Sequence, residues 1–187
     1  MIKAIITDFD GTLVDTFDAN LATYQKVLGD YGIVLTREKY HECFGLRFDA
    51  FMTVVGVDDE LMRDSIKEAK TAMYPSFFEK LLPNKVLIDF LMTVRASGVK
   101  IAIASTARKE NLMNVLSYLG LDKSFDLIMA GVNVSKGKPD PEIYTLTMSQ
   151  LGVSPDEVLI FEDSQVGLQA AEASGARYIK ITEKFFK

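Results

Sequence analysis

The stretch "IITDFDGTLVDT", residues 5–16, decides how the rest of this sequence is interpreted. Its apolar start predicts a buried strand, and the strand runs directly into Asp8 and Asp10, with Gly11 immediately after. Residues i and i+2 of an extended chain point to the same side, so the two acids are expected to face one cleft while Phe9 packs behind them. The stretch therefore predicts a strand whose carboxyl end presents two carboxylates.

Five apolar segments of the chain have the character of strands. They cover residues 3–9, 99–105, 125–131, 157–163 and 176–181. Most are continuously apolar, as expected for strands buried on both faces of a parallel sheet. Helical patterns over residues 107–120, 140–152 and 164–175 stand between the later strands, and each ends on a glycine. This alternation predicts an α/β fold with a Rossmann-like, doubly wound parallel sheet.

Residues 15–83 break this alternation. They contain helical patterns over residues 18–32, 37–45 and 58–81, with no convincing strand between them. A block of this length is too long for a simple crossover between neighbouring strands. We therefore expect a core domain made of residues 1–14 and 84–187, and a small all-helical cap domain over residues 15–83.

Composition excludes several classes of protein. The chain has 187 residues, of which 48% are hydrophobic and 25% charged, as in an ordinary globular protein. A formal net charge of -5 disfavours a nucleic-acid partner. The single cysteine, Cys43, and the single histidine, His41, exclude an intrachain disulfide and a Cys/His zinc cluster. Without a membrane-length apolar segment or a signal-peptide pattern, we expect a cytoplasmic monomer with no membrane partner.

Acidic residues also end a second predicted strand, at Glu162 and Asp163. Ligands of open α/β sheets bind at the carboxyl ends of the strands, so these acids are expected to meet Asp8 and Asp10 at one edge. Such carboxylates repel one another, and a hard divalent cation, Mg²⁺ above all, relieves the repulsion. The alternative is that Asp10 and Gly11 form a simple turn, and that Glu162 and Asp163 mark the start of a helix.

Two further segments offer groups that bind phosphate. Ser105 and Thr106 end an apolar strand and are expected to open a helix, where hydroxyls and free amides form an anion site. Lys138 lies in "KGKPDP", residues 136–141, where two prolines stiffen the turn that carries the amine. The alternatives are that Thr106 is only a helix N-cap and that Lys138 is an exposed loop lysine.

Taken together, these segments resemble the haloacid dehalogenase superfamily of phosphotransferases across essentially the whole chain. The resemblance rests on "DFDGT" (8–12), "ASTA" (104–107), "KGKPDPEIY" (136–144) and "FEDSQVG" (161–167), which occur in the family's order. The helical insertion resembles the family's first cap type, as in β-phosphoglucomutase-like and phosphoglycolate-phosphatase-like members.

The resemblance implies a role for each acid and for the metal. Asp8 would be the nucleophile that forms an aspartyl-phosphate, and Asp10 the general acid and base. Mg²⁺ would be held by the Asp8 carboxylate, the Asp10 backbone carbonyl, Glu162 and Asp163.

The remaining implied roles concern the substrate, a small phosphorylated metabolite. Ser105 and Lys138 would bind the transferring phosphoryl group, with Thr106 beside them, and Gly11 and Thr12 would complete the loop. "CFGLRFDA", residues 43–50, is a candidate substrate loop, in which Arg47 would meet a second anionic group or would simply be an exposed arginine.

These implications favour a Mg²⁺-dependent phosphatase, with two alternatives. A sugar-phosphate mutase of the β-phosphoglucomutase type is disfavoured, because similar mutases carry a histidine where "TFDAN", residues 16–20, has none. A non-enzymatic phosphate-binding or signalling module is the other alternative. A signalling receiver would place its acceptor aspartate on a strand in the middle of the chain, not on the first strand, and would lack the helical insertion.

Overall fold

A computed structural model describes residues 1–186, apart from the side chain of Glu183, and the chain divides into two compact units. The core unit comprises Met1–Asp15 and the chain from Leu82 onward, and the helical unit comprises Thr16–Leu81. These bounds lie one and two residues from the expected divisions. The role of the helical unit as a cap stays a prediction.

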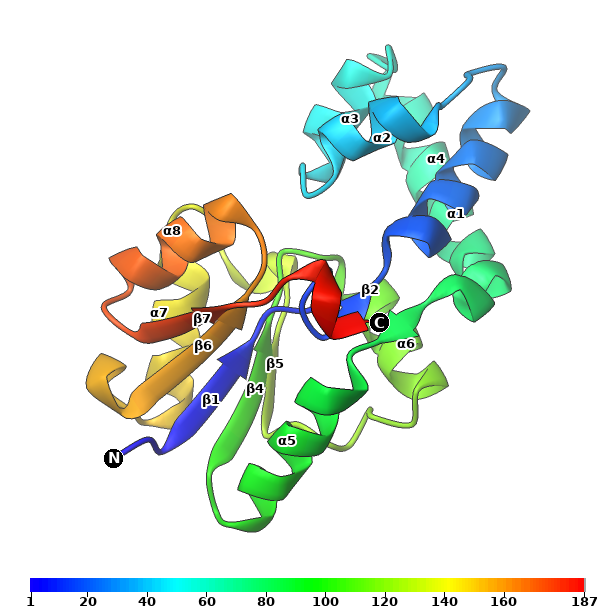
Figure 1. The fold of residues 1–187 in the computed structure, drawn as a ribbon. Coiled ribbons are helices and arrows are strands. Elements are labelled where there is room, and N and C mark those ends of the chain that lie inside the picture. Colours follow the sequence, from blue (N-terminus) through cyan, green and yellow to red (C-terminus); the bar gives the residue numbers. More distant parts are fainter. Residues whose placement is uncertain (187) are drawn as a thin grey trace. The chain divides into compact units, whose positions relative to one another are not determined.

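The core unit is built on a five-stranded parallel sheet with the order β5-β4-β1-β6-β7 (Figure 1). The strands are β1 (Ala4–Thr7), β4 (Lys100–Ala104), β5 (Leu127–Met129), β6 (Val158–Glu162) and β7 (Arg177–Lys180). Strand β1 is central, and its Ile6 lies opposite Ala102 of β4 and Ile160 of β6. The predicted doubly wound α/β fold is confirmed.

Helices pack on both faces of this sheet. They are α5 (Lys85–Ala96), α6 (Lys109–Tyr118), α7 (Glu142–Leu151) and α8 (Gln165–Ala173), with short 3₁₀ helices η2 (Gly131–Asn133), η3 (Pro155–Glu157) and η4 (Glu183–Phe186). Helices α7 and α8 bury Ile143 and Ala170 against the sheet residues Ile6 and Ile160. Helix α5 lies on the opposite face, where the Phe90 ring packs edge-on against Phe161 with ring centroids 6.0 Å apart.

The helical unit has its own apolar core, which includes the fully buried Leu28, Met52 and Ile66. Its elements are α1 (Phe17–Asp30), α2 (Arg37–Cys43), α3 (Phe48–Val54), α4 (Glu60–Met73) and the 3₁₀ helix η1 (Tyr74–Lys80). The expected helical character of this block is confirmed. The candidate substrate loop is shorter than expected, because α3 already begins at Phe48.

Two short strands, which the sequence did not reveal, stand where the chain leaves and re-enters the core unit. Strand β2 (Val14–Asp15) pairs antiparallel with β3 (Leu82–Pro83). Asn84 follows directly and is fully buried. Its side-chain amide donates to the Thr12 carbonyl (3.1 Å), and its side-chain oxygen accepts from the Leu87 amide and caps α5 (3.0 Å). Asn84 thus ties the start of α5 to the loop after β1.

None of the helices within residues 1–186 combines the length and apolarity needed to cross a membrane.

Replacing Asn84 with alanine is expected to lower the free energy of unfolding by about 2–3 kcal/mol, because a helix cap and a buried hydrogen bond are lost together. Urea unfolding followed by circular dichroism measures the loss. Thr93→Ala is a suitable control, since Thr93 is an exposed residue of the same helix whose hydroxyl donates only to the Asp89 carbonyl. Equal stabilities of the two variants would show that Asn84 does not tie these segments together.

Candidate active site

The loop after β1 folds tightly against the end of β6. The Asp8 amide donates to the Phe161 carbonyl (2.9 Å) and so extends the pairing of the two strands. Gly11 has a φ of +86°, and a Cβ at this position would collide with the Asp163 carboxylate. The Thr12 hydroxyl donates to Asp163 Oδ1 at 2.8 Å. Glycine is therefore required here both for its backbone conformation and for the approach of an acid from another strand.

Three carboxylates gather at this edge of the sheet. Asp8, Glu162 and Asp163 each place an oxygen within 4.8 Å of the others. Asp8 and Glu162 are buried, with 7% and 1% of their surfaces exposed. The structure therefore brings together three of the four acids that the sequence singled out.

Lys138 is the cation of this cluster. Its Nζ lies 2.6 Å from Asp8 Oδ1 and 2.6 Å from Glu162 Oε1, and only 5% of its side chain is exposed. Glu142, at the start of α7, holds the loop before Lys138 in place by accepting from the backbone amides of Ser135 (3.0 Å) and Lys136 (2.7 Å). The alternative that Lys138 is an exposed loop lysine is wrong.

Burial and the neighbouring charges shift the pKa values of the residues in this cluster. Burial raises the pKa of Asp8 well above its usual value, and the neighbouring Glu162 and Asp163 add to the effect while Lys138 opposes it. Burial also raises the pKa of Asp163 to about 6, against a lowering by the hydrogen bond from Thr12. Burial alone would lower the pKa of Lys138, but Asp8 leads the groups that outweigh it and raise this pKa well above its usual value. The single positive charge of Lys138 does not balance three carboxylates. The carboxylate oxygens of these acids are ligands that suit a hard divalent cation.

Glu162 is the most firmly held acid. Its Oε2 accepts from the backbone amide (2.8 Å) and the hydroxyl (3.2 Å) of Ser164, which is also the N-cap of α8. A Cβ at Gly167 would collide with the same carboxylate. Sequence reasoning missed Tyr144, whose buried hydroxyl donates to Glu162 Oε1 at 3.3 Å, although this residue closes the quoted motif "KGKPDPEIY".

Ser105 and Thr106 follow β4, the neighbour of β1. Ser105 is buried, its amide donates to the Met129 carbonyl (3.0 Å), and its Oγ accepts from the Ala107 amide (3.1 Å). The expectation that these residues open a helix is wrong, because α6 begins at Lys109 and its N-cap is Arg108. Their hydroxyls stand in a turn before the helix, and their role toward phosphate stays a prediction.

Two further expected site residues lie on other segments of the chain. Asp10 lies in the turn after β1, where it forms an isolated bridge with Val14. Among the described residues, the carboxylate cluster does not include its side chain. Arg47 belongs to the helical unit, where it is exposed at the N-cap of α3. The functional roles of both residues stay predictions.

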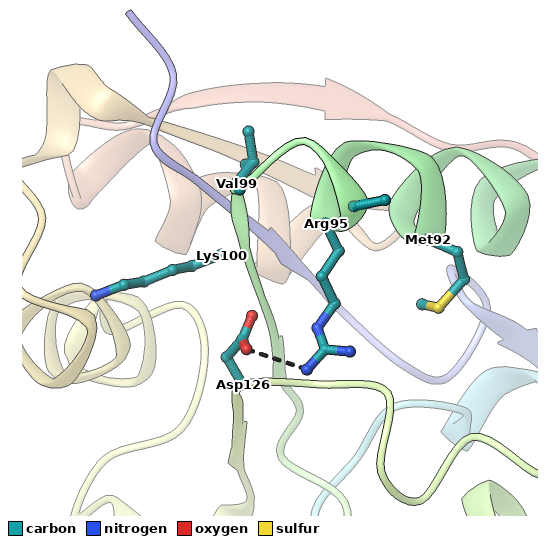
Figure 2. A pocket seen from close by; sticks show the side chains of 7 residues that line it. Met92, Arg95, Val99, Lys100 and Asp126 are labelled. Carbon is teal, nitrogen blue, oxygen red and sulfur yellow. Dashed lines mark hydrogen bonds and ion pairs between the residues drawn. The ribbon is translucent and has the colours of Figure 1, made fainter.

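A separate pocket of about 400 Å³ lies at the start of β4, the opposite end of that strand from Ser105. Figure 2 shows Arg95 pointing toward Asp126, to which it is paired at 3.3 Å, while Lys100 extends away. The Lys100 ammonium donates to the Leu151 carbonyl at 2.7 Å. These charged groups are engaged by the protein itself, so the carboxylate cluster is the candidate active site.

Comparison with known proteins agrees with this geometry. The family model for haloacid dehalogenase-like hydrolases matches residues 5–181. The chain is 31% identical over 182 residues to a phosphorylated carbohydrates phosphatase from Thermotoga maritima, covering 95% of this chain and 84% of that protein. It is 24% identical over 184 residues to a beta-phosphoglucomutase from Bacillus subtilis, covering 93% of this chain and 80% of that protein. The crystal structure of CbbY from Rhodobacter sphaeroides in complex with phosphate superimposes with a TM-score of 0.89 at 26% identity, covering 100% of this chain and 89% of the other.

The chain belongs to the haloacid dehalogenase-like hydrolase family. The predicted family and enzyme class, a hydrolase related to phosphatases, are therefore confirmed.

Without a divalent cation, the protein is expected to be more stable at pH 5 than at pH 7. The pKa of Asp163 is about 6 in the folded chain and 3.8 for an ordinary aspartate, so the folded state binds the proton more tightly. Stability then rises as the pH falls through 6, by on the order of 1–2 kcal/mol. Thermal unfolding in a chelating buffer at several pH values measures this slope. Asp163→Asn should reduce the slope, and an unchanged slope would show that Asp163 is not the group that takes up this proton.

Proposed function

We propose that this hydrolase is a Mg²⁺-dependent phosphatase, which hydrolyses a small phosphomonoester through an aspartyl-phosphate on Asp8. The observation that carries the proposal is the buried contact of Asp8 with Lys138, beside Glu162 and Asp163. An acid in this position is held by a cation that also suits the oxygens of a phosphoryl group. Membership of the family supports the same chemistry.

The proposed reaction has two steps, which use the side chains of Asp8 and Asp10 in the loop after β1. A carboxylate oxygen of Asp8 attacks phosphorus, and the bond from phosphorus to the ester oxygen breaks while Asp10 donates a proton to that leaving oxygen. Asp10 then takes a proton from a water molecule that attacks the phosphorus of the aspartyl-phosphate. Cleavage of the bond between phosphorus and the Asp8 oxygen releases inorganic phosphate and restores both acids.

The acids also form the proposed magnesium site. Asp8, Glu162, Asp163 and the backbone carbonyl of Asp10 would hold the ion, and their hard oxygen donors fit it. When bound, the ion supplies positive charge that lets an anionic carboxylate approach an anionic phosphate. The raised pKa values of Asp8 and Asp163 support this assignment, because buried carboxylates that also repel one another are stabilised when a cation binds between them.

The remaining proposed contacts orient the substrate. Ser105 and Thr106 would donate to the phosphoryl oxygens from the turn after β4, and the backbone of Gly11 and Thr12 would complete the loop around them. Arg47, exposed in the helical unit, would bind a second anionic group of the substrate.

A phosphorylated carbohydrate is the substrate class that we propose, because the relative from Thermotoga maritima carries that activity in its name. A cytoplasmic location and a monomeric state stay predictions from the sequence.

The mutase alternative has one specific observation in its favour, the relative named beta-phosphoglucomutase. The two activities give different products from one substrate. Incubation with a hexose 1-phosphate releases inorganic phosphate in the phosphatase and yields an isomeric hexose phosphate in the mutase.

Asp8→Asn is expected to abolish phosphate release from an aryl phosphate, because the amide cannot form the acyl-phosphate. Continuous absorbance of the released phenolate measures turnover, and circular dichroism checks the fold. Asp89→Asn, an exposed aspartate on α5, should retain wild-type turnover. Full activity of the Asp8 variant would remove Asp8 as the nucleophile.

Mg²⁺ is expected to raise the thermal midpoint of the wild-type protein at pH 7.5 and to do so less at pH 5, because protons compete for Asp163. Differential scanning fluorimetry with and without the ion measures the shift, and Asp163→Asn should reduce it. Chelation should stop phosphate release, and added Mg²⁺ should restore it. Hydrolysis that persists after chelation would contradict the proposed metal site.

A further inference from the structure

Tyr144 is a buried tyrosine of α7 that lies against the charged cluster. It has no exposed surface, and its hydroxyl donates to Glu162 Oε1 at 3.3 Å. The Nζ of Lys138 lies 5.0 Å from the centroid of its ring. A buried phenol requires a hydrogen-bond partner. The phenol shares the acceptor Glu162 Oε1 with Lys138, and its oxygen also forms a side-chain hydrogen bond with the Lys138 ammonium.

The hydrogen bonds of Glu162 are distributed over both of its oxygens. Oε1 accepts from Lys138 and Tyr144, and Oε2 accepts from the amide and hydroxyl of Ser164. Four donors thus share the two oxygens of this carboxylate. The negative charge on Oε1 is therefore shared between a lysine and a phenol, and not committed to the lysine alone.

Lys138 lies between two carboxylates that compete for it. Its Nζ is 2.6 Å from Asp8 Oδ1 and 2.6 Å from Glu162 Oε1. If the phenol were absent, Oε1 would keep Lys138 as its only donor and would hold the ammonium more strongly. The contact of the ammonium with Asp8 would then weaken, because the negative charge on Oε1 would no longer be partly neutralised by the phenol and would attract the ammonium more strongly.

We propose that Tyr144 is a positioning residue whose hydroxyl keeps Lys138 in contact with Asp8, where the ammonium meets the transferring phosphoryl group. Tyr144 acts through Glu162 and Lys138 and does not touch the reacting atoms. This inference rests on the proposed phosphatase function. It adds to that function a residue which determines how strongly Lys138 stabilises the transition state.

The test compares wild-type protein with Tyr144→Phe, which removes the hydroxyl and keeps the ring beneath the ammonium. With Mg²⁺ and an aryl phosphate, kcat should fall about 10-fold while KM stays within about twofold, because contacts behind a catalytic group affect the transition state more than ground-state binding. The inhibition constant of orthovanadate, which mimics the five-coordinate phosphorus, should rise by a similar factor.

Two further variants separate positioning from a general structural effect. Tyr178→Phe makes the same change on the exposed edge strand β7 and should match wild type in kcat and in vanadate inhibition. Tyr144→Leu removes the ring as well as the hydroxyl and should lower kcat further. All assays are run well below the lowest thermal midpoint of the set, so that unfolding does not contribute.

Each outcome decides the proposal. A parallel change in kcat and in the vanadate constant for Tyr144→Phe, with KM unchanged, supports it. Wild-type values for both constants in Tyr144→Phe would overturn it and leave the phosphatase function intact. A fall in kcat with unchanged vanadate inhibition would also overturn it. No phosphate release by the wild-type protein would overturn the phosphatase function and this inference together.

Discussion

The ammonium of Lys138 between Asp8 and Glu162 is the contact on which the rest of the site depends. Both acids are buried, and each lies 2.6 Å from the same nitrogen. Two buried carboxylates without a counter-charge would be strongly destabilising, so the lysine makes their arrangement possible. The third acid, Asp163, leaves the cluster short of positive charge. This deficit is what suits the cluster to a divalent cation and to an anionic substrate.

The sheet explains why these groups meet. Strands β1 and β6 are parallel neighbours, and Thr7 pairs with Phe161, so Asp8 and Glu162 emerge side by side from the two strand ends. Gly11 and Gly167 then leave room for the carboxylates of Asp163 and Glu162. An alanine at either position would place a methyl group where a carboxylate now lies. The register of the strands sets the positions of the acids. Because the two glycines have no Cβ, the carboxylates can lie close against the backbone at these positions.

The hydrolase activity and the choice of substrate belong to different parts of the chain in this proposal. The core unit holds the acids, Lys138 and the turn with Ser105, which are proposed to act on the phosphoryl group whatever the rest of the substrate is. The helical unit has a separate apolar core and carries the exposed Arg47. Changes on its surface could therefore alter substrate preference while leaving the phosphoryl chemistry of the core unit intact.

The sequence by itself determined the alternation of strands and helices, because continuous apolar runs and helix-ending glycines are local patterns. It also singled out Asp8, Lys138, Glu162 and Asp163, since polar residues that follow apolar strands collect at one edge of a parallel sheet. It did not reveal β2 and β3, which are too short to carry a pattern. The sequence patterns do not predict helices α3 and α5, although Leu87 and Leu91 of α5 have helical spacing.

Only the tertiary structure decided which of these groups touch. Lys138 stands 130 residues from Asp8 and could have been an exposed loop lysine, and burial against two acids depends on strand register and on the Glu142 contacts that hold its loop. The same holds for Tyr144, whose helical spacing indicates only a core position. Its hydroxyl gained a role because the packing of α7 against the sheet places it at Glu162. Contacts between segments far apart in the chain depend on that packing, which no local pattern encodes.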